Sequence, residues 1–304
     1  MTSGGGKDVA ASVRARLANE AKKTNRPFAE LLQYYAMERL LYRLSQSPHA
    51  DKFVLKGALM LVAWRASAFR PTKDIDFLAR LPNDIDNVAS LFKEVCNLPV
   101  TDDGMAFDAD SVQGRLIKED ADYEGVRITF RGYLQRARAS MQIDVGFGDV
   151  VVPPPVLSQY PTILEFAAPE LLGYSRETTI AEKFEAMVKL GQLNSRMKDF
   201  YDIHLLARQF AFDGPLVCEA LRRTFDNRGT TVTASPVAWT PDFVEDPAKQ
   251  TQWAGFLRKS RLDDAPPTLP ETIESVRAFL QPAAAAVESG QPFNFQWQPG
   301  GPWE

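Results

Sequence analysis

The sequence predicts an α+β protein in which a core with a mixed or antiparallel sheet precedes a mainly helical C-terminal region. Three observations predict this class. Short apolar or alternating segments of strand type fill the first half of the chain, at 53–55, 74–78, 106–119, 122–134 and 138–149. Three successive prolines at 153–155 then interrupt any strand or helix. Further on, apolar residues recur at helical spacing in 177–191, 197–211 and 214–227.

Composition narrows the class of protein. The chain has 304 residues, 45% of them apolar and 24% charged, as in an ordinary globular protein. Its formal charge of −4 means that a nucleic-acid partner would be held by a local basic patch. The two cysteines, Cys96 and Cys218, are too few for a disulfide framework, which favours a reducing cytoplasm. Because neither a signal-peptide core nor a long apolar run is present, we expect no export and no membrane span.

The remaining segments complete the expected organisation. Helices are predicted at 7–22, 27–46, 84–97, 249–260 and 270–281, with a long loop at 228–247. The second of these helices should cover the sheet with one broad apolar face. We therefore expect N-terminal helices at 1–50, a core at 51–152, a mainly helical domain at 153–285 and a flexible tail at 286–304.

One short stretch carries the chemistry of the core. A strand is followed by a turn at Gly57, an apolar helix to about Phe69 and a second strand with Asp74 and Asp76. Side chains two apart on a strand share a face, so both carboxylates point the same way. Paired carboxylates suit Mg²⁺ or Mn²⁺, and backbone N–H groups at a helix start bind phosphate. The stretch therefore indicates metal-assisted chemistry on a nucleoside triphosphate.

The glycine turn and the Asp-x-Asp strand are more specific together than either feature is alone. Taken alone, an Asp-x-Asp pair is more often a solvated strand edge, a turn or a calcium loop. The glycine turn, helix and Asp-x-Asp strand together resemble the polymerase β-like nucleotidyltransferases, which have Gly-Ser or Gly-Gly before Asp-x-Asp; here Ala58 replaces the second small residue. The resemblance implies a third carboxylate from a neighbouring strand. Asp144 has that place, and a surface aspartate on an edge strand is the alternative.

A second group of charged residues lies in the helical half. Lys183 belongs to the segment Ala181-Glu182-Lys183-Phe184-Glu185-Ala186-Met187, and Asn194-Ser195-Arg196-Met197-Lys198-Asp199-Phe200-Tyr201-Asp202 follows it. Asp199 and Asp202 are three residues apart and so share one face of a helix. A single lysine on a helix is usually solvated. A functional role for Lys183 is therefore indicated only by the order of three sequence blocks: the stretch from Gly57 to Asp76, the segment around Lys183, and the segment 194–202.

Taken in order, the three blocks resemble the AbiEii/AbiGii-type nucleotidyltransferase toxins over roughly residues 25–285. The resemblance implies that Asp74 and Asp76 bind metal and that Asp144 completes the metal set. It also implies that Lys183 contacts the nucleotide and that Asp202 is essential, which gives Asp74, Asp76, Lys183 and Asp202 as the catalytic residues. The expected nucleotide-binding residues are Lys56, Gly57, Ala58, Thr72, Lys73, Arg196 and Asp199.

The function implied by the resemblance is Mg²⁺- or Mn²⁺-dependent transfer of nucleotides from a nucleoside triphosphate to RNA, with the tRNA 3′ end as the expected acceptor. Such transfer blocks translation in toxin–antitoxin or phage-defence systems, and an antitoxin is expected from a neighbouring gene. Seven arginines could form the phosphate patch for the acceptor, or could belong to solvated faces: Arg127, Arg131, Arg136 and Arg138 on two strands, and Arg222, Arg223 and Arg228 on a later helix and its exit. Two alternatives stay open: transfer to a small molecule or a protein, and a non-catalytic module that binds nucleotide or RNA.

Overall fold

The structure is a computed structural model that describes residues 8–66, 71–120, 123–262 and 265–304. The chain divides into two compact units. The first comprises residues within 1–63, 72–148 and 157–173, and the second comprises residues within 64–71, 149–156 and 174–304. Each unit has its own core, and each contains strands as well as helices.

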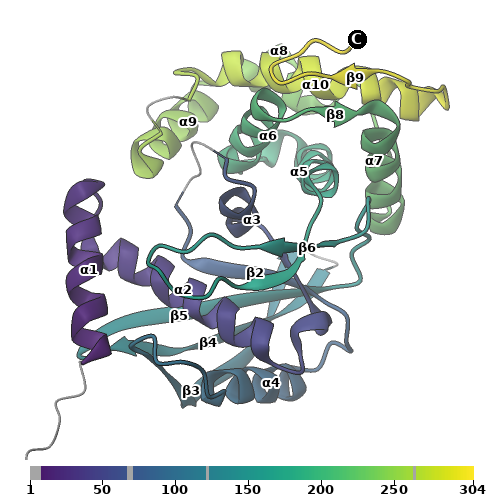
Figure 1. Cartoon of the computed structure of the whole chain (residues 1–304). Helices are drawn as coiled ribbons and strands as arrows, with labels where there is room; N and C mark the ends of the chain where they lie inside the picture. Colours follow the sequence, from purple (N-terminus) through teal and green to yellow (C-terminus); the bar gives the residue numbers. More distant parts are fainter. Residues whose placement is uncertain (1–7, 67–70, 121–122, 263–264) are drawn as a thin grey trace, which may run out of the picture. The chain divides into compact units, whose positions relative to one another are not determined.

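The described strands of the first unit form one mixed sheet, whose order is β3-β4-β5-β2-β1-β7-β6. Figure 1 labels β2, β3, β4, β5 and β6 of this sheet. β2 pairs in parallel with β5 and antiparallel with β1, while β3, β4 and β5 are antiparallel neighbours. The mixed sheet expected from the sequence is confirmed. Its strands are β1 (Phe53–Lys56), β2 (Asp74–Ala79), β3 (Met105–Asp120), β4 (Tyr123–Leu134), β5 (Ala137–Phe147), β6 (Val156–Gln159) and β7 (Glu170–Gly173).

Helices of the first unit cover the sheet with their apolar residues. The helices are α1 (Val9–Lys23), α2 (Phe28–Gln46), α3 (Ala58–Ala63) and α4 (Ile85–Asn97), preceded by a short η1 (Ala50–Lys52) before β1. The rings of Phe53, Phe77 and Phe92 lie close together, with centroids 5.3–6.4 Å apart, and so join β1, β2 and α4 in one core. Asp84 caps α4 by accepting a hydrogen bond from the Asn87 amide.

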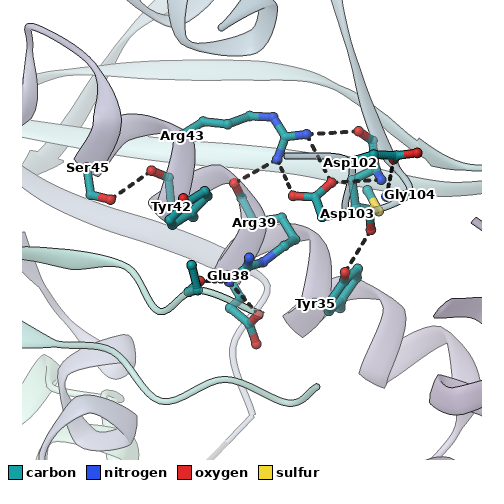
Figure 2. Close-up of polar contacts among 11 residues, drawn as sticks. Tyr35, Glu38, Arg39, Tyr42, Arg43, Ser45, Asp102, Asp103 and Gly104 are labelled. Atoms are coloured by element: carbon teal, nitrogen blue, oxygen red, sulfur yellow. Dashed lines mark hydrogen bonds and ion pairs between the residues drawn. The ribbon is translucent and has the colours of Figure 1, made fainter. Parts of the chain in front are cut away.

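Buried charges on α2 fix two loops of the first unit (Figure 2). Arg43 donates two hydrogen bonds to the Asp103 carboxylate, at 2.7 and 3.0 Å, and both side chains are buried. Arg39 pairs with Glu38 and donates to the Ala167 carbonyl, each at 2.8 Å, and the Glu38 carboxylate accepts from the Ile163 amide. Because buried charges are stable only when paired, these contacts hold both loops against α2.

Two parts of the first unit differ from the expectation. Residues 157–173 were assigned to the C-terminal domain, but β7 pairs in parallel with β1 and so returns this segment to the sheet. The helix after Gly57 ends at Ala63 rather than near Phe69, and Phe69 lies outside the described residues. Arg65 has a positive φ of 57°, which is incompatible with continuing a right-handed helix.

The second unit is mainly helical, as the sequence predicts. Its helices are α5 (Arg176–Leu190), α6 (Met197–Gln209), α7 (Gly214–Arg228), α8 (Pro241–Val244), α9 (Pro247–Ser260) and α10 (Leu269–Ser289), with short η2 (Gly191–Leu193) and η3 (Val237–Trp239). The loop expected at 228–247 therefore contains η3 and α8. Trp239 and Phe243 anchor them, because both side chains are buried against the helices.

The tail at 286–304 is packed, which corrects the expectation of a flexible segment. Its first residues extend α10 to Ser289, and β9 (Gln296–Trp297) pairs with β8 (Phe212–Asp213). The Trp297 indole is only 4% exposed and donates to the Ala207 carbonyl. The glycines and prolines that suggested disorder alternate with aromatic side chains, and burial of these rings favours an ordered tail.

The helices give no sign of a membrane span. Within 8–66, 71–120, 123–262 and 265–304, none is long and apolar enough to cross a bilayer.

Candidate active site

The paired aspartates lie on β2, in the middle of the sheet of the first unit. Asp74 and Asp76 are half-buried on one face of the strand, whereas Ile75 and Phe77 are completely buried behind it. This arrangement follows from strand alternation. The predicted shared face of the two carboxylates is therefore present.

Gly57 makes room for the Asp76 carboxylate. The pairing of β1 with β2 sets Lys56 opposite Asp76, and the chain then turns at Gly57 with φ of +70°. A Cβ atom at Gly57 would lie 2.0 Å from Oδ2 of Asp76, so no other residue fits beside this carboxylate in its present position. Ala58, which follows, is only 3% exposed, and its contact with the nucleotide stays a prediction.

Thr72 fixes the start of β2. Its hydroxyl accepts from the Asp74 amide and donates to the Asp74 carbonyl, both at 3.3 Å, and its own amide donates to the Tyr34 hydroxyl at 2.9 Å. Lys73 is exposed, and its carbonyl accepts a hydrogen bond from Gln33 of α2. Thr72 therefore positions the strand that carries the carboxylates, while the Lys73 side chain is accessible to a ligand.

Asp144 lies on the strand expected for it. β5 is the parallel neighbour of β2, and Asp144 is in register with Asp76. Its carboxylate also forms two hydrogen bonds with Arg127 of β4, at 2.7 and 2.6 Å. The hydrogen bond to Asp144 raises the pKa of Arg127, burial opposes this, and the charges of Asp74 and Asp76 add to the rise.

These contacts decide how well the site fits a divalent cation. Asp74 and Asp76 offer hard oxygen ligands on one face, as Mg²⁺ and Mn²⁺ require. Asp144 is engaged by Arg127 instead, and no group of three or more His, Cys, Asp or Glu residues able to hold a metal is found in the described part of the chain. The aspartate pair of β2 therefore fits the ion, and the third ligand stays a prediction. The pairing of Arg127 with Asp144 was missed because the sequence alone does not give the register of β4 and β5.

The second group of predicted residues forms an ion-pair cluster in the second unit. Lys183 of α5 lies 2.8 Å from Oδ1 of Asp199 and 2.8 Å from Oδ2 of Asp202, both on α6. All three side chains are largely buried, with exposed fractions of 13%, 5% and 1%. The shared helix face predicted for the two aspartates is confirmed, and both of them hold the lysine.

Arg196 precedes the first residue of α6 and lies three residues before Asp199 in the sequence. Its amide donates to the Asn194 side chain at 2.8 Å, and the Arg196 side chain is half-buried. Its predicted contact with the nucleotide stays a prediction.

Arg228, considered above for a phosphate patch, has carboxylate partners that were not expected. Arg228 of α7 pairs with three carboxylates of the second unit, those of Asp149, Glu182 and Glu185, at 3.1–3.4 Å. Burial opposes the charge of Arg228, but these carboxylates raise its pKa above the ordinary value. The two glutamates are three residues apart on α5, which was the available signal. The cluster joins α5 to α7 and has a structural role.

A mixed sheet whose central strand carries two carboxylates beside a glycine turn defines the class of the chain as a nucleotidyltransferase. The family described as "Nucleotidyl transferase AbiEii toxin, Type IV TA system" matches residues 39–281, and the chain belongs to this family. The family predicted from the sequence is thus confirmed. Membership implies a nucleoside triphosphate as substrate and an antitoxin as partner.

Solved structures with a similar course of the chain come from Helicobacter pylori. One, described as a candidate nucleotidyltransferase, has a TM-score of 0.48 and 18% identity, and covers 87% of this chain and 98% of its own. Another, JHP933, has a TM-score of 0.45 and 15% identity, and covers 86% and 92%. A comparison with curated proteins gives no match.

Proposed function

We propose that the chain transfers a nucleotide from a nucleoside triphosphate to the 3′ end of RNA, with tRNA as the acceptor, and thereby blocks translation. We further propose that the reaction needs Mg²⁺ or Mn²⁺. The observation that supports the chemistry is the carboxylate pair of β2, in which the Asp76 carboxylate occupies the space left by the absent side chain of Gly57. RNA as acceptor, tRNA as its identity and the block of translation rest on the resemblance to the toxin family.

The reaction is a displacement at phosphorus. The oxygen of the acceptor hydroxyl forms a bond to the α-phosphorus, the bond from that phosphorus to the bridging oxygen of the β-phosphate breaks, and pyrophosphate leaves. The hydroxyl proton passes to a carboxylate of the site and then to water. When bound, Mg²⁺ or Mn²⁺ neutralises phosphate charge and lowers the pKa of the attacking hydroxyl.

The residues of the first unit have separate roles in this proposal. Asp74 and Asp76 hold the divalent ion, and Lys56 and Gly57 bind the triphosphate through the turn that follows β1. Asp144 keeps Arg127 on the same face of the sheet, where the guanidinium can offset the charge of the carboxylates and phosphates.

For Lys183 of the second unit, a contact with the nucleotide rests on the resemblance to the toxin family. Two buried carboxylates hold it at 2.8 Å, so its ammonium group is ordered before substrate binds. Asp199 and Asp202 are then positioning residues that act through Lys183.

The test is transfer of label to RNA by purified protein. The protein is incubated with Mg²⁺, total bacterial tRNA and each α-labelled nucleoside triphosphate in turn, beside the variants Asp76→Asn and Asp86→Asn. Asp86 is exposed in the first turn of α4 and provides the matched control for loss of one carboxylate charge. We expect label on RNA with the wild type and with Asp86→Asn, and a loss of about a thousandfold with Asp76→Asn.

The other outcomes separate the alternatives. Label on protein or on a small molecule, with none on RNA, would replace the acceptor in this proposal. Tight binding of nucleotide or RNA without any transfer would support a non-catalytic module instead.

A further inference from the structure

A pocket of about 550 Å³ lies on the first unit, beside Asp74. Residues of β3, β4 and β5 form most of its wall, and Lys73 and Asp74 complete it at the start of β2. No step of the mechanism above uses this space. Its position next to one of the two proposed metal-binding carboxylates suggests that it holds part of a substrate.

The register of the sheet sets the chemistry of the pocket. Asp74 is opposite Gln142, Gln142 is opposite Thr129, and Thr129 is opposite Gln113. Side chains opposite each other on neighbouring strands share a face, so uncharged polar groups form a row that starts at Asp74. Amide and hydroxyl groups both donate and accept hydrogen bonds. The row therefore matches a nucleobase edge or the hydroxyls of a ribose.

Positive charge lies along the same pocket. Lys73, Arg131 and Arg138 line it and are exposed, and the acidic residues of the lining are Asp74 and Asp110. Arg131 is paired with Asp108 at 2.9 Å, which fixes the guanidinium at the wall. Cations next to a row of hydrogen-bonding groups fit a ligand that has both a phosphate and a nucleoside.

The order of the strands distinguishes the two substrates. On one side of β2 lies β1, which leads into the turn at Gly57 where the triphosphate is proposed to bind. On the other side lies β5, and the pocket extends from there over β4 and β3. In a displacement at phosphorus the attacking and leaving oxygens are roughly in line, so the acceptor approaches from the side away from the pyrophosphate. The pocket is on that side.

We propose that this pocket binds the 3′-terminal nucleotide of the RNA acceptor and directs its hydroxyl toward the α-phosphorus at Asp74 and Asp76. The row of Gln142, Thr129 and Gln113 contacts the terminal nucleoside, and Lys73, Arg131 and Arg138 contact the phosphates that precede it. This inference rests on the function proposed above.

The first test separates the two substrates by steady-state kinetics. In the double variant Gln113→Ala/Arg138→Ala we expect the KM for RNA to rise about tenfold, while the KM for the nucleoside triphosphate stays the same. Both side chains are exposed, so the fold should tolerate the change. Lys93→Ala is the control for loss of positive charge. Lys93 is exposed on α4. A Cβ atom at Gly114 of β3 would contact Ile85 of α4, whereas the preceding residue, Gln113, lines the pocket. Because neighbouring residues of a strand face opposite sides, α4 and the pocket lie on opposite faces of the sheet.

A second measurement does not depend on catalysis. Fluorescence anisotropy with labelled tRNA, in the absence of nucleoside triphosphate and divalent ion, should give a Kd about tenfold higher for the double variant than for the wild type and Lys93→Ala. RNA labelling by all three proteins with unchanged KM and Kd for RNA would overturn the inference and leave the proposed function intact. A rise in the KM for the nucleoside triphosphate alone would assign the pocket to the incoming nucleotide. Failure of the wild type to label RNA would overturn the function and, with it, this inference.

Discussion

The carboxylates of the two units are held in different ways. On β2 of the first unit, Asp74 and Asp76 are half-buried and directed by strand alternation, and a missing side chain at Gly57 leaves the space that the Asp76 carboxylate fills. On α6 of the second unit, Asp199 and Asp202 are buried and share one lysine. The first arrangement keeps oxygen atoms accessible to an ion or a substrate, whereas the second fixes a cation. Substitutions should therefore affect activity in the first unit and both stability and activity in the second.

The largest effect is expected when the cation of the second unit is removed. Lys183→Met leaves Asp199 and Asp202 buried beside each other without their partner, which should lower the free energy of unfolding by about 3 to 5 kcal/mol. Urea unfolding of the variant and the wild type measures this difference. We expect Asp76→Asn, in the first unit, to unfold at the same urea concentration as the wild type. Equal stability of Lys183→Met and wild type would show that the cluster contributes nothing to the fold.

The next effect isolates the space at Gly57. In Gly57→Ala, the new Cβ atom must displace the Asp76 carboxylate, and we expect nucleotide transfer to fall about a hundredfold. Gly229→Ala is a matched control, since Gly229 also has a positive φ, of 63°, but has no atom within 4 Å of the position of a Cβ. Both variants carry backbone strain of about 1 kcal/mol. Equal loss of activity in the two would refute the steric role of Gly57.

A pH effect is expected from a buried carboxylate of the first unit that lies on α2, away from the strand that carries the site. Burial raises the pKa of Glu38 from 4.5 to about 7, against the opposing effect of Arg39. The folded state therefore holds this proton more tightly than the unfolded state, so stability falls as pH rises from about 4.5 to about 7. The loss is on the order of 2 to 3 kcal/mol.

Glu38→Gln tests this effect, because glutamine keeps an oxygen that can accept from the Ile163 amide but does not titrate. We expect a flatter dependence of the unfolding free energy on pH in the variant than in the wild type. Parallel curves for the two proteins between pH 4.5 and pH 7 would contradict the shift.

The smallest effect concerns the ion pair between Arg127 and Asp144, which is partly exposed. Arg127→Met should destabilise the protein by about 1 kcal/mol and release the Asp144 carboxylate next to Asp76. Mn²⁺ should then bind about tenfold more tightly, because a further hard oxygen ligand becomes available. Isothermal titration with Mn²⁺ measures this directly, and Arg115→Met, which removes the neighbouring arginine of the same row, is the control. Unchanged affinity would mean that Asp144 does not reach the ion.

Sequence reasoning succeeded where the signal is local. Strand alternation is enough to bring Asp74 and Asp76 to one face, and helical spacing is enough for Asp199 and Asp202. The neighbouring strand of Asp144 required the resemblance to a known fold as well, because alternation alone does not reveal which strands pair.

The features that were missed depend on contacts between distant parts of the chain. β7 pairs with β1 across more than a hundred residues of sequence, with Leu55 opposite Gly173. The four residues of β7 show no sequence pattern from which the neighbouring strand could be predicted. The pairing of Arg127 with Asp144 depends on the register of two long strands. The prediction for the tail was wrong because it was based on the content of glycine and proline. Composition does not reveal that the Trp297 indole is buried and donates a hydrogen bond to the Ala207 carbonyl.

The absence of a side chain at Gly57 also has a genetic consequence. Every single-base change at the first or second position of a glycine codon introduces a residue with a Cβ atom or a stop codon. At this position the Cβ atom of each such residue would collide with the Asp76 carboxylate. Cells forced to express the toxin without its antitoxin should therefore escape often through changes in this one codon, and sequencing the survivors would reveal them.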